Sequence, residues 1–165
     1  MKARMAMGRV ERGASIVNTG SICTRHVTVC ERQATVLEAA QLMREQHVGD
    51  LVVIEMSGGR RVPVGMLTDR DIVLAIVAKQ ANPEKIFVND VMSSPPALIS
   101  EGDDLWLAAS RMHLNGVRRL PVVDGAGELT GIVSLDDLLE AVSGLLSELW
   151  RVTGRQPHIE QKSRA

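Results

Sequence analysis

The stretch GMLTDRDIV, at residues 65–73, occurs a second time in the chain as GIVSLDDLL at residues 131–139. Each version has apolar residues, then a hydroxyl residue, then an aspartate three positions further on, and it becomes apolar again with helical spacing. This pattern predicts a strand that runs directly into a helix. Because it occurs twice in 165 residues, it indicates an internal repeat, and a repeat decides the fold of the whole chain.

The repeat also covers the sequence before these two stretches. A shift of 69 positions places apolar residues on apolar residues without a gap: Ile22 on Val91, Ala39 on Ala108, Ala40 on Ala109, Met43 on Met112, Val48 on Val117, Leu51 on Leu120 and Val53 on Val122. Further along the shift becomes 66, so the first half is three residues longer at a hairpin loop, where an insertion is tolerated. The chain therefore reads as two copies of one module.

Both modules predict the same order of elements: strand, helix, strand, strand, helix. Apolar residues with helical spacing mark residues 36–43 and 105–112, and short apolar runs next to glycine mark the strands. The predicted strands are HVTVC (26–30), LVVI (51–54), VPVGML (62–67), PALIS (96–100), LPVV (120–123) and LTGIV (129–133). A last helix is expected to begin near Asp71 in the first module and near Asp137 in the second. The fold class that follows is α/β (α+β), built from a tandem repeat.

The two modules are expected to form one unit. A module of about 60 residues buries only about 60% of its unfolded surface and is marginally stable alone, so two modules packed sheet to sheet would share a core. We expect a pseudo-twofold pair. The expected boundaries are a flexible leader at 1–19, a first module at 20–79, a linker at 80–89, a second module at 90–150 and a disordered tail at 151–165.

The strand–helix junction carries a family signature. The signature consists of glycine, two apolar residues, Thr or Ser, any two residues, and then Asp. The second copy is preceded by RRLPVVD at residues 118–124. On these residues the chain resembles the cystathionine-β-synthase (CBS) domain pair, in particular stand-alone bacterial CBS-pair proteins, including hypoxic-response proteins. The resemblance covers about residues 20–150. The resemblance implies tandem CBS repeats with a cleft that binds AMP, ADP, ATP or S-adenosylmethionine. It also implies a regulatory sensor role that requires no cofactor. The protein would form a homodimer and act on an unknown regulated protein.

The resemblance also implies which residues hold each part of the ligand. The residues that contact the ribose hydroxyls and the phosphates would be Asp71, Asp137, Thr68, Ser134, Arg118 and Arg119. Those around the adenine would be Thr28 and Ala97, through their backbone, with Met66 and Ile132. The chemistry agrees, because a carboxylate accepts two hydrogen bonds from a cis-diol and an arginine presents a planar fork to phosphate.

A structural role is the alternative for the same residues. Thr68 with Asp71, and Ser134 with Asp137, also have the spacing of a capping box, which closes a helix N-terminus without any ligand. The two arginines could equally be a solvated pair at the end of a strand. Both interpretations remain open at the level of the sequence.

The two modules differ at the position of the arginines. The repeat places Gly49 and Asp50 of the first module where the second has Arg118 and Arg119. A carboxylate there would repel a triphosphate unless a cation intervenes, so we expect two unequal sites. The site at residues 68–71, close to both arginines, is expected to be the stronger one.

Two other functions are considered. Cys23, His26 and Cys30 form C-x2-H-x3-C, and a fourth ligand from His47 or a partner chain would make the protein a metal or redox sensor. Structural zinc usually has two paired ligand clusters, however, and both cysteines can be small buried residues instead. The other alternative is a ligand-free dimerisation or scaffold protein whose clefts are vestigial.

The composition narrows the classes of function. A net charge of −1 provides no basic face for nucleic acid, and the chain has no tyrosine, one phenylalanine and two tryptophans for stacking on bases. Its apolar runs are too short for a membrane span or a signal peptide, so we expect a cytoplasmic protein. It has no nucleophile elbow, Walker-type loop or zinc-protease motif, so we expect a non-enzyme.

The predicted last helix continues past the repeat with apolar residues at helical spacing. These are Leu138, Leu139, Val142, Leu145, Leu146, Leu149 and Trp150. Such a stretch is more apolar than one module needs and is typical of an association face, the alternative being an ordinary core helix.

Overall fold

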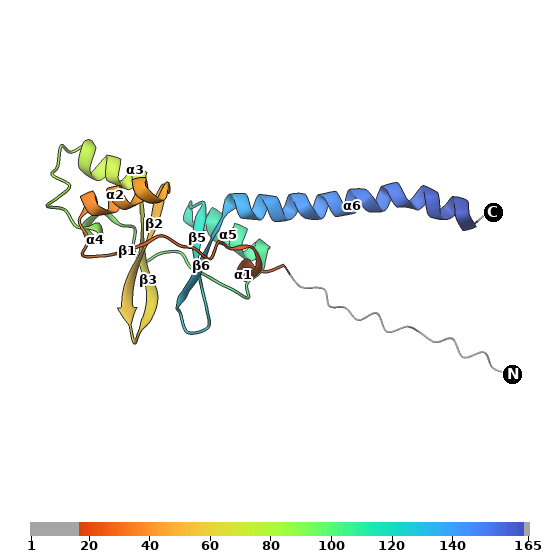
Figure 1. Cartoon of the computed structure of the whole chain (residues 1–165), viewed down its shortest axis with the longest axis horizontal. Helices are drawn as coiled ribbons and strands as arrows, with labels where there is room; N and C mark the ends of the chain where they lie inside the picture. Colours follow the sequence, from red (N-terminus) through yellow and green to blue (C-terminus); the bar gives the residue numbers. More distant parts are fainter. Residues whose placement is uncertain (1–16, 164–165) are drawn as a thin grey trace.

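The computed structural model describes the backbone of residues 17–163 and the side chains of residues 17–152. Its strands form two three-stranded sheets, one from each half of the chain (Figure 1). The strands of the first sheet are β1 (Val29–Glu31), β2 (Asp50–Ser57) and β3 (Arg60–Thr68), and those of the second are β4 (Ile99–Ser100), β5 (Arg119–Val123) and β6 (Leu129–Ser134). In each sheet the first strand pairs parallel with the second, and the second antiparallel with the third. The predicted repeat is confirmed.

A helix joins the first two strands of each sheet, because parallel strands need a crossover connection. These helices are α2 (Val36–Gln46) and α5 (Leu105–Asn115). After the third strand the first module enters α3 (Asp69–Ile72), which continues as a π-helical turn over Val73–Val77, and the second module enters α6 (Leu135–Ser163). The predicted order of elements is present in both modules.

Each module has its own hydrophobic core, built from equivalent positions of the repeat. The buried residues at such positions are Ala39 and Ala108, Met43 and Met112, Leu51 and Leu120, and Leu67 and Val133. Successive side chains of a strand point to opposite faces. Leu67 of β3 therefore serves the first core, whereas its neighbour Met66 packs against a different cluster.

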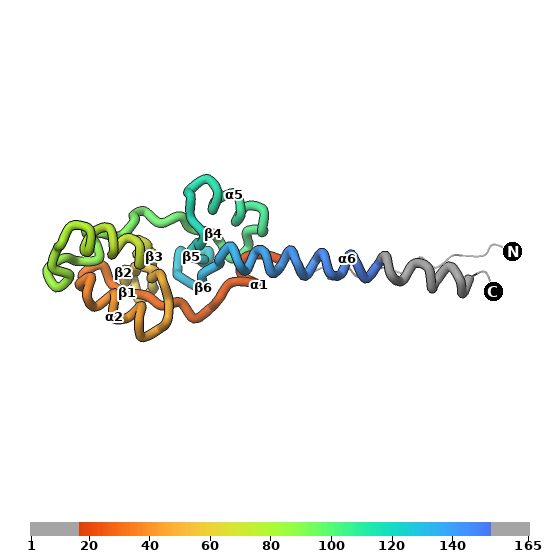
Figure 2. The backbone as a smooth tube through the Cα atoms, turned by 90° about the horizontal axis from the view of Figure 1, so that it is seen from above, coloured from red at the N-terminus to blue at the C-terminus, as the bar shows by residue number. Residues whose placement is uncertain are grey.

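That third cluster joins the two modules. It contains Val52 and Ile54 of β2 with Leu129 of β6, which are 0%, 6% and 2% exposed. Met66 and Ile132, which are equivalent in the repeat, pack at its edge. The modules lie side by side in Figure 2, the first in orange to green and the second in teal to blue. The expected pseudo-twofold pair with a shared core is therefore confirmed.

A short helix that the sequence did not predict, α1 (Thr19–Ile22), begins the first module but packs on the second. The Thr19 N–H donates to the Asp103 carbonyl at 2.9 Å, and the Thr19 side chain is fully buried. Arg25, just after the helix, forms a salt bridge with Glu101. These contacts attach the first residues of one module to the other.

The equivalent helix α4 (Val88–Val91) begins the second module but packs on the first, so the two modules exchange their first helices. Val88 is fully buried in the first-module core, and its N–H donates to the Ala34 carbonyl at 2.8 Å. Residues 80–89 were expected to be a linker because they are polar and contain a proline. Their last part is instead a structural element of the first module, because a single well-placed apolar side chain can attach a polar segment to a core.

The two ends of the chain differ from expectation in different ways. Of the expected leader at 1–19, residues 1–16 lie outside the described residues, whereas Asn18 caps α1. A disordered tail was expected from residue 151, but α6 continues to Ser163, because each residue added to an existing helix gains a backbone hydrogen bond. In the part of the chain that the structure describes, no helix is long and apolar enough to cross a membrane.

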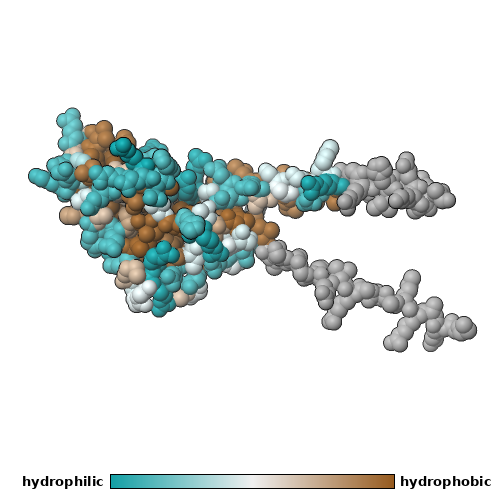
Figure 3. All heavy atoms as spheres, in the orientation of Figure 1, coloured by the Kyte–Doolittle hydropathy of each residue, from teal (hydrophilic) through white to brown (hydrophobic). Residues whose placement is uncertain are grey.

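Only the beginning of α6 belongs to a core. Leu138 is 5% exposed and packs in the second-module cluster. Further along, Val142, Leu145 and Leu149 are 46%, 61% and 55% exposed. The helix extends away from both modules (Figures 1 and 2), and apolar side chains lie along its described part in Figure 3. The interpretation of this stretch as an ordinary core helix is therefore wrong beyond its first turn.

Candidate functional site

Two clefts open where the modules meet. Cleft A, about 630 Å³ in volume, is lined by the predicted residues Met66, Thr68, Asp71, Ala97, Arg118 and Arg119. Cleft B, about 290 Å³ in volume, is lined by the predicted residues Thr28, Ile132, Ser134, Asp137 and again Arg119. Every residue that the sequence assigned to ligand binding thus lines one of these clefts.

The clefts resemble each other because the repeat builds them in the same way. Within β2 and β3, Asp50 pairs with Thr68, and within β5 and β6, Arg119 pairs with Ser134. The start of one strand therefore lies beside the strand–helix junction of the same module. Each cleft is lined on one side by the strand–helix junction of one module and on the other side by residues of the other module.

Backbone bridges fix one wall of each cleft. Met66 and Ser93 exchange two hydrogen bonds, at 3.0 Å and 2.8 Å, in which each N–H donates to the other carbonyl. Ile132 and Thr24 do the same at 3.0 Å and 2.9 Å. These bridges hold the segments that follow α4 and α1 against the third strand of the opposite module, so the exchange of the short helices also shapes the clefts.

At both junctions the hydroxyl residue and the aspartate form a capping box. The Asp71 Oδ2 atom accepts from the Thr68 N–H at 2.9 Å and from the Thr68 hydroxyl at 2.7 Å, while Thr68 Oγ1 accepts from the Asp71 N–H at 3.2 Å. Ser134 and Asp137 make the same contacts at 2.7, 2.7 and 3.2 Å. The structural alternative is therefore present at both sites. Because both bonds to each carboxylate go to Oδ2, the box itself does not use Oδ1.

The repeat places Asp50 at the position equivalent to Arg119, and the structure pairs these two residues. Arg119 Nη1 donates to Asp50 Oδ2 in a salt bridge, and both residues line both clefts. The Asp50 side chain is only 13% exposed. Burial raises the pKa of Asp50, and the adjacent Arg119 guanidinium opposes part of that rise. Sequence reasoning found the position of Asp50 but missed its partner, which lies 69 residues away.

The charges of the two clefts are unequal. The charged residues of cleft A are Arg70, Arg118, Arg119, Asp50, Asp69 and Asp71. Arg118 is 76% exposed and lies 4.0 Å from an equally exposed Asp136, a weak pair that leaves its guanidinium accessible to an anion. Cleft B has a single arginine, Arg119, with two histidines, His26 and His47, and two aspartates.

The two cysteines do not form the suggested metal site with His26. Cys30 is 8% exposed in the first-module core, whereas Cys23 packs against the second-module core. Among the residues described here, no three His, Cys, Asp or Glu side chains are grouped so that they could hold a metal ion. Cys23 and Cys30 therefore belong to different cores, because the exchange of α1 separates residues that are close in sequence.

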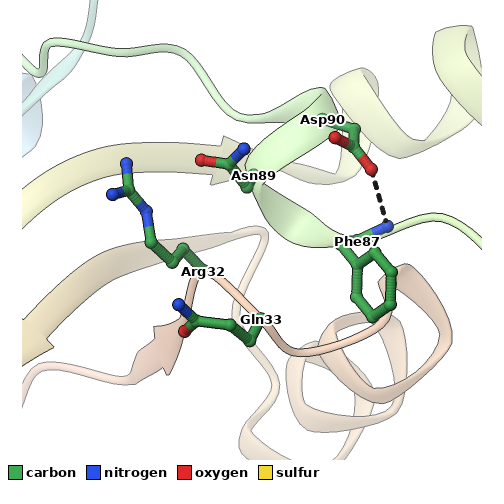
Figure 4. A pocket seen from close by; sticks show the side chains of 5 residues that line it. All are labelled: Arg32, Gln33, Phe87, Asn89 and Asp90. Atoms are coloured by element: carbon green, nitrogen blue, oxygen red, sulfur yellow. Dashed lines mark hydrogen bonds between the residues drawn. The ribbon is translucent and has the colours of Figure 1, made fainter.

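Another pocket, about 300 Å³ in volume, lies between α4 and the loop after β1 and is lined by Arg32, Gln33, Phe87, Asn89 and Asp90 (Figure 4). The Asp90 carboxylate accepts from the Phe87 N–H at 3.2 Å. The Arg32 guanidinium lies 3.9 Å from the Glu55 carboxylate. None of the residues predicted to bind a ligand lies in this pocket, and it lacks the paired hydroxyl and aspartate of the two clefts.

Comparison with known proteins supports the repeat. The family model of the CBS domain matches the chain twice, at residues 20–78 and 88–144. The CBS domain-containing protein YhcV of Bacillus subtilis is 40% identical over 120 residues, which is 72% of this chain and 79% of that protein. An uncharacterized protein of Methanopyrus kandleri is 32% identical over 133 residues, which is 81% of this chain but only 66%, just under two thirds, of that protein.

Solved structures have the same fold. Hypoxic Response Protein I, solved with two coordinated zinc ions, matches with a TM-score of 0.65 and 28% identity, over 75% of this chain and 98% of that chain. A CBS domain protein of Pyrobaculum aerophilum complexed with AMP matches with a TM-score of 0.66 and 26% identity, over 73% of this chain and 89% of that chain.

Proposed function

Because this chain belongs to the CBS domain family and contains two copies of the domain, we propose that it is a regulatory module that binds an adenosine nucleotide in clefts A and B. The observation that carries the proposal is the position of both strand–helix junctions. Each junction brings a hydroxyl residue and an aspartate into a cleft that the other module completes. The AMP complex of the Pyrobaculum protein supports an adenosine ligand. ADP, ATP and S-adenosylmethionine share the same adenosine group.

The residues of cleft A suit the parts of such a ligand. A carboxylate can accept two hydrogen bonds from the cis-diol of a ribose, and the capping box engages only Oδ2 of Asp71. The exposed guanidinium of Arg118 can grip a phosphate with two parallel N–H groups. Met66 and Ala97 offer apolar surface to the adenine. The residues therefore bind and orient, and we propose no catalytic role for them.

Cleft A is proposed as the stronger site. Its volume is about twice that of cleft B, and it has two arginines, Arg70 and Arg118, in addition to the shared Arg119. A nucleotide has an anionic phosphate and a bulky base, so charge and space both favour cleft A. Cleft B would accept a ligand with fewer phosphates.

Thermal unfolding of the full chain with AMP, ADP, ATP, S-adenosylmethionine and GTP tests the proposal. A ligand at 100 times its dissociation constant adds about 2.7 kcal/mol to the free energy of unfolding, which for a chain of this size raises the midpoint by roughly 5–10 °C. We expect such a shift with at least one adenosine compound and not with GTP. Midpoints that stay constant with every ligand would favour the ligand-free scaffold instead.

The variants must separate ligand binding from helix capping. Asp71→Ala removes both functions in cleft A, and Asp137→Ala does so in cleft B. A matched control is Glu38→Ala, because Thr35 and Glu38 form the same capping box at α2, outside both clefts. We expect all three variants to be less stable without ligand, but only Asp71→Ala to lose most of the ligand-induced shift.

The proposed module is a homodimer in which α6 pairs with α6 of a second copy. The exposed apolar residues Val142, Leu145, Leu149 and Val152 follow the alternating spacing of three and four that two identical helices need for a common seam. A cytoplasmic location remains a prediction from the sequence.

A further inference from the structure

Asp50 and Arg119 occupy the same position of the repeat in the two modules. The shift of 69 residues places one on the other, and they are the first residues of β2 and β5. A pseudo-twofold arrangement brings equivalent residues at its centre face to face. Two aspartates or two arginines would repel each other there, whereas the residues of this chain carry opposite charges and form a salt bridge.

This pair lies on the border between the two clefts. Of the residues that line the clefts, Gly49, Asp50 and Arg119 are common to both. The wall between the clefts therefore has one guanidinium and one carboxylate. The carboxylate is 13% exposed and the guanidinium side chain 47% exposed, so Arg119 is the partner that can more readily turn toward a ligand.

A phosphate in cleft A would compete with Asp50 for Arg119, because a guanidinium binds phosphate and carboxylate with the same planar fork. Cleft B has no other arginine or lysine in its lining. Once Arg119 is engaged in cleft A, cleft B keeps two carboxylates, Asp50 and Asp137, without that counter-charge. An anion in cleft B would then face like charges in a partly buried wall.

We propose that the Asp50–Arg119 pair couples the two clefts negatively, so that the first nucleotide to bind weakens the binding of a second nucleotide to the same chain. This inference rests on the proposed function and specifies its regulation. Coupling is reciprocal, so a ligand in cleft B disfavours cleft A by the same factor. The chain then responds to nucleotide mainly through one occupied cleft.

Calorimetric titration of the full chain with AMP tests the inference. In the wild-type chain we expect one strong AMP site and a second site roughly 5–150-fold weaker, the usual range of coupling between sites. Asp50→Asn keeps the shape of the side chain and removes its charge, and we expect it to narrow this gap severalfold, leaving the part of the gap that the larger volume and additional arginines of cleft A produce.

Glu84→Gln is the matched control, because Glu84 is exposed, lines neither cleft and loses the same charge. We expect it to keep the wide gap between the two affinities. Two equal, independent AMP sites in the wild-type chain would overturn the inference, as would an unchanged gap in Asp50→Asn or an equal narrowing in Glu84→Gln.

Asp50→Ala serves as a second charge-removing variant if Asp50→Asn does not fold, and the wild-type titration by itself can overturn the inference. The outcomes also separate the two proposals. Two equal sites would refute the coupling and leave the nucleotide-binding function standing. No binding of AMP or any other adenosine compound to the wild-type chain would refute the function itself, and the coupling with it.

Discussion

Gly65 in β3 and Gly131 in β6 are equivalent residues, both buried where another segment crosses the strand. A Cβ atom on Gly65 would lie 2.4 Å from the Met92 sulfur, and one on Gly131 would lie 2.6 Å from the Cys23 sulfur. In each case a backbone carbonyl oxygen lies at 3.1 Å. The glycine of the repeated junction is therefore required for close packing, because it lets the segments after α1 and α4 bridge to the third strands.

Gly131→Ala should destabilise the fold. The added methyl overpacks a site bounded by backbone, which typically costs about 1–3 kcal/mol of unfolding free energy. Urea unfolding followed by circular dichroism measures this loss. Gly125→Ala is the control, because no atom lies within 4 Å of its added Cβ. Equal stability of the two variants would contradict the packing role.

Cys30 should be unreactive in the folded protein. Burial raises the pKa of its thiol to about 11, and the thiolate is the form that alkylating reagents attack. In a Cys23→Ser background at pH 8, iodoacetamide should modify Cys30 at least about tenfold more slowly in the native chain than in urea, as measured by mass spectrometry. Similar rates in both conditions would show that the core around Cys30 opens readily.

The raised pKa of Cys30 also lowers the stability of the folded chain at high pH. The folded state holds the Cys30 proton more tightly than the unfolded state, so the stability that this group contributes is fully present below its unfolded pKa. That contribution is lost as the pH rises from about 9 through about 11. Cys30→Ala should flatten this part of the pH dependence of the unfolding free energy.

At the scale of elements, α6 differs most from its counterpart. The equivalent segment of the first module ends in a short π-helical turn, Val73–Val77, whereas α6 is 29 residues long. A long helix with few tertiary contacts gains little from propensity alone, and its stability normally depends on packing of an apolar face. The exposed stripe defined by Val142, Leu145, Leu149 and Val152 is the face available for such packing.

Leu145→Asp combined with Leu149→Asp should disrupt the proposed dimer. A charge in the seam of two paired helices leaves a carboxylate buried without a partner, so we expect the mass in sedimentation equilibrium to fall from two chains to one. The control is Trp106→Asp on α5, which is 84% exposed and outside the stripe. A dimer that survives the α6 variant and is lost in the control would assign the interface to α5.

At the scale of the whole molecule, the two modules are not separable units. Thr19 is buried in contact with the second module and Val88 in the core of the first, so each module lacks a part that the chain supplies from elsewhere. The cluster of Val52, Ile54 and Leu129 adds a core that neither module has alone. Both clefts are also lined by residues of both modules, so the two modules must fold together before a ligand can bind.

Leu129→Ala should therefore weaken the whole pair rather than one module. Truncating a buried leucine costs about 2–5 kcal/mol, and because the cluster is shared, calorimetry should still detect one transition at a lower midpoint. Leu114→Ala, at a position 78% exposed on α5, should change stability by less than about 0.5 kcal/mol. A second transition in Leu129→Ala would mean that the modules unfold independently.

The sequence alone determined the elements that are repeated in the two modules and the positions of the two strand–helix junctions. Helical spacing and strand alternation are local properties, and the repeat fixes which positions of the two modules are equivalent. Thr68 and Asp71, like Ser134 and Asp137, could be assigned to a strand–helix junction because capping depends on residues only three positions apart. The family resemblance then added the expectation that these junctions border a cleft.

Only the tertiary structure decided which distant residues meet. The exchange of α1 and α4 depends on where single side chains such as Val88 find a core, and it separates Cys23 from Cys30 despite their nearness in sequence. The pairing of Asp50 with Arg119 depends on how the modules pack against each other. Contacts of this kind leave no periodic signal in the sequence, because they follow from long-range packing and burial rather than from local backbone preference.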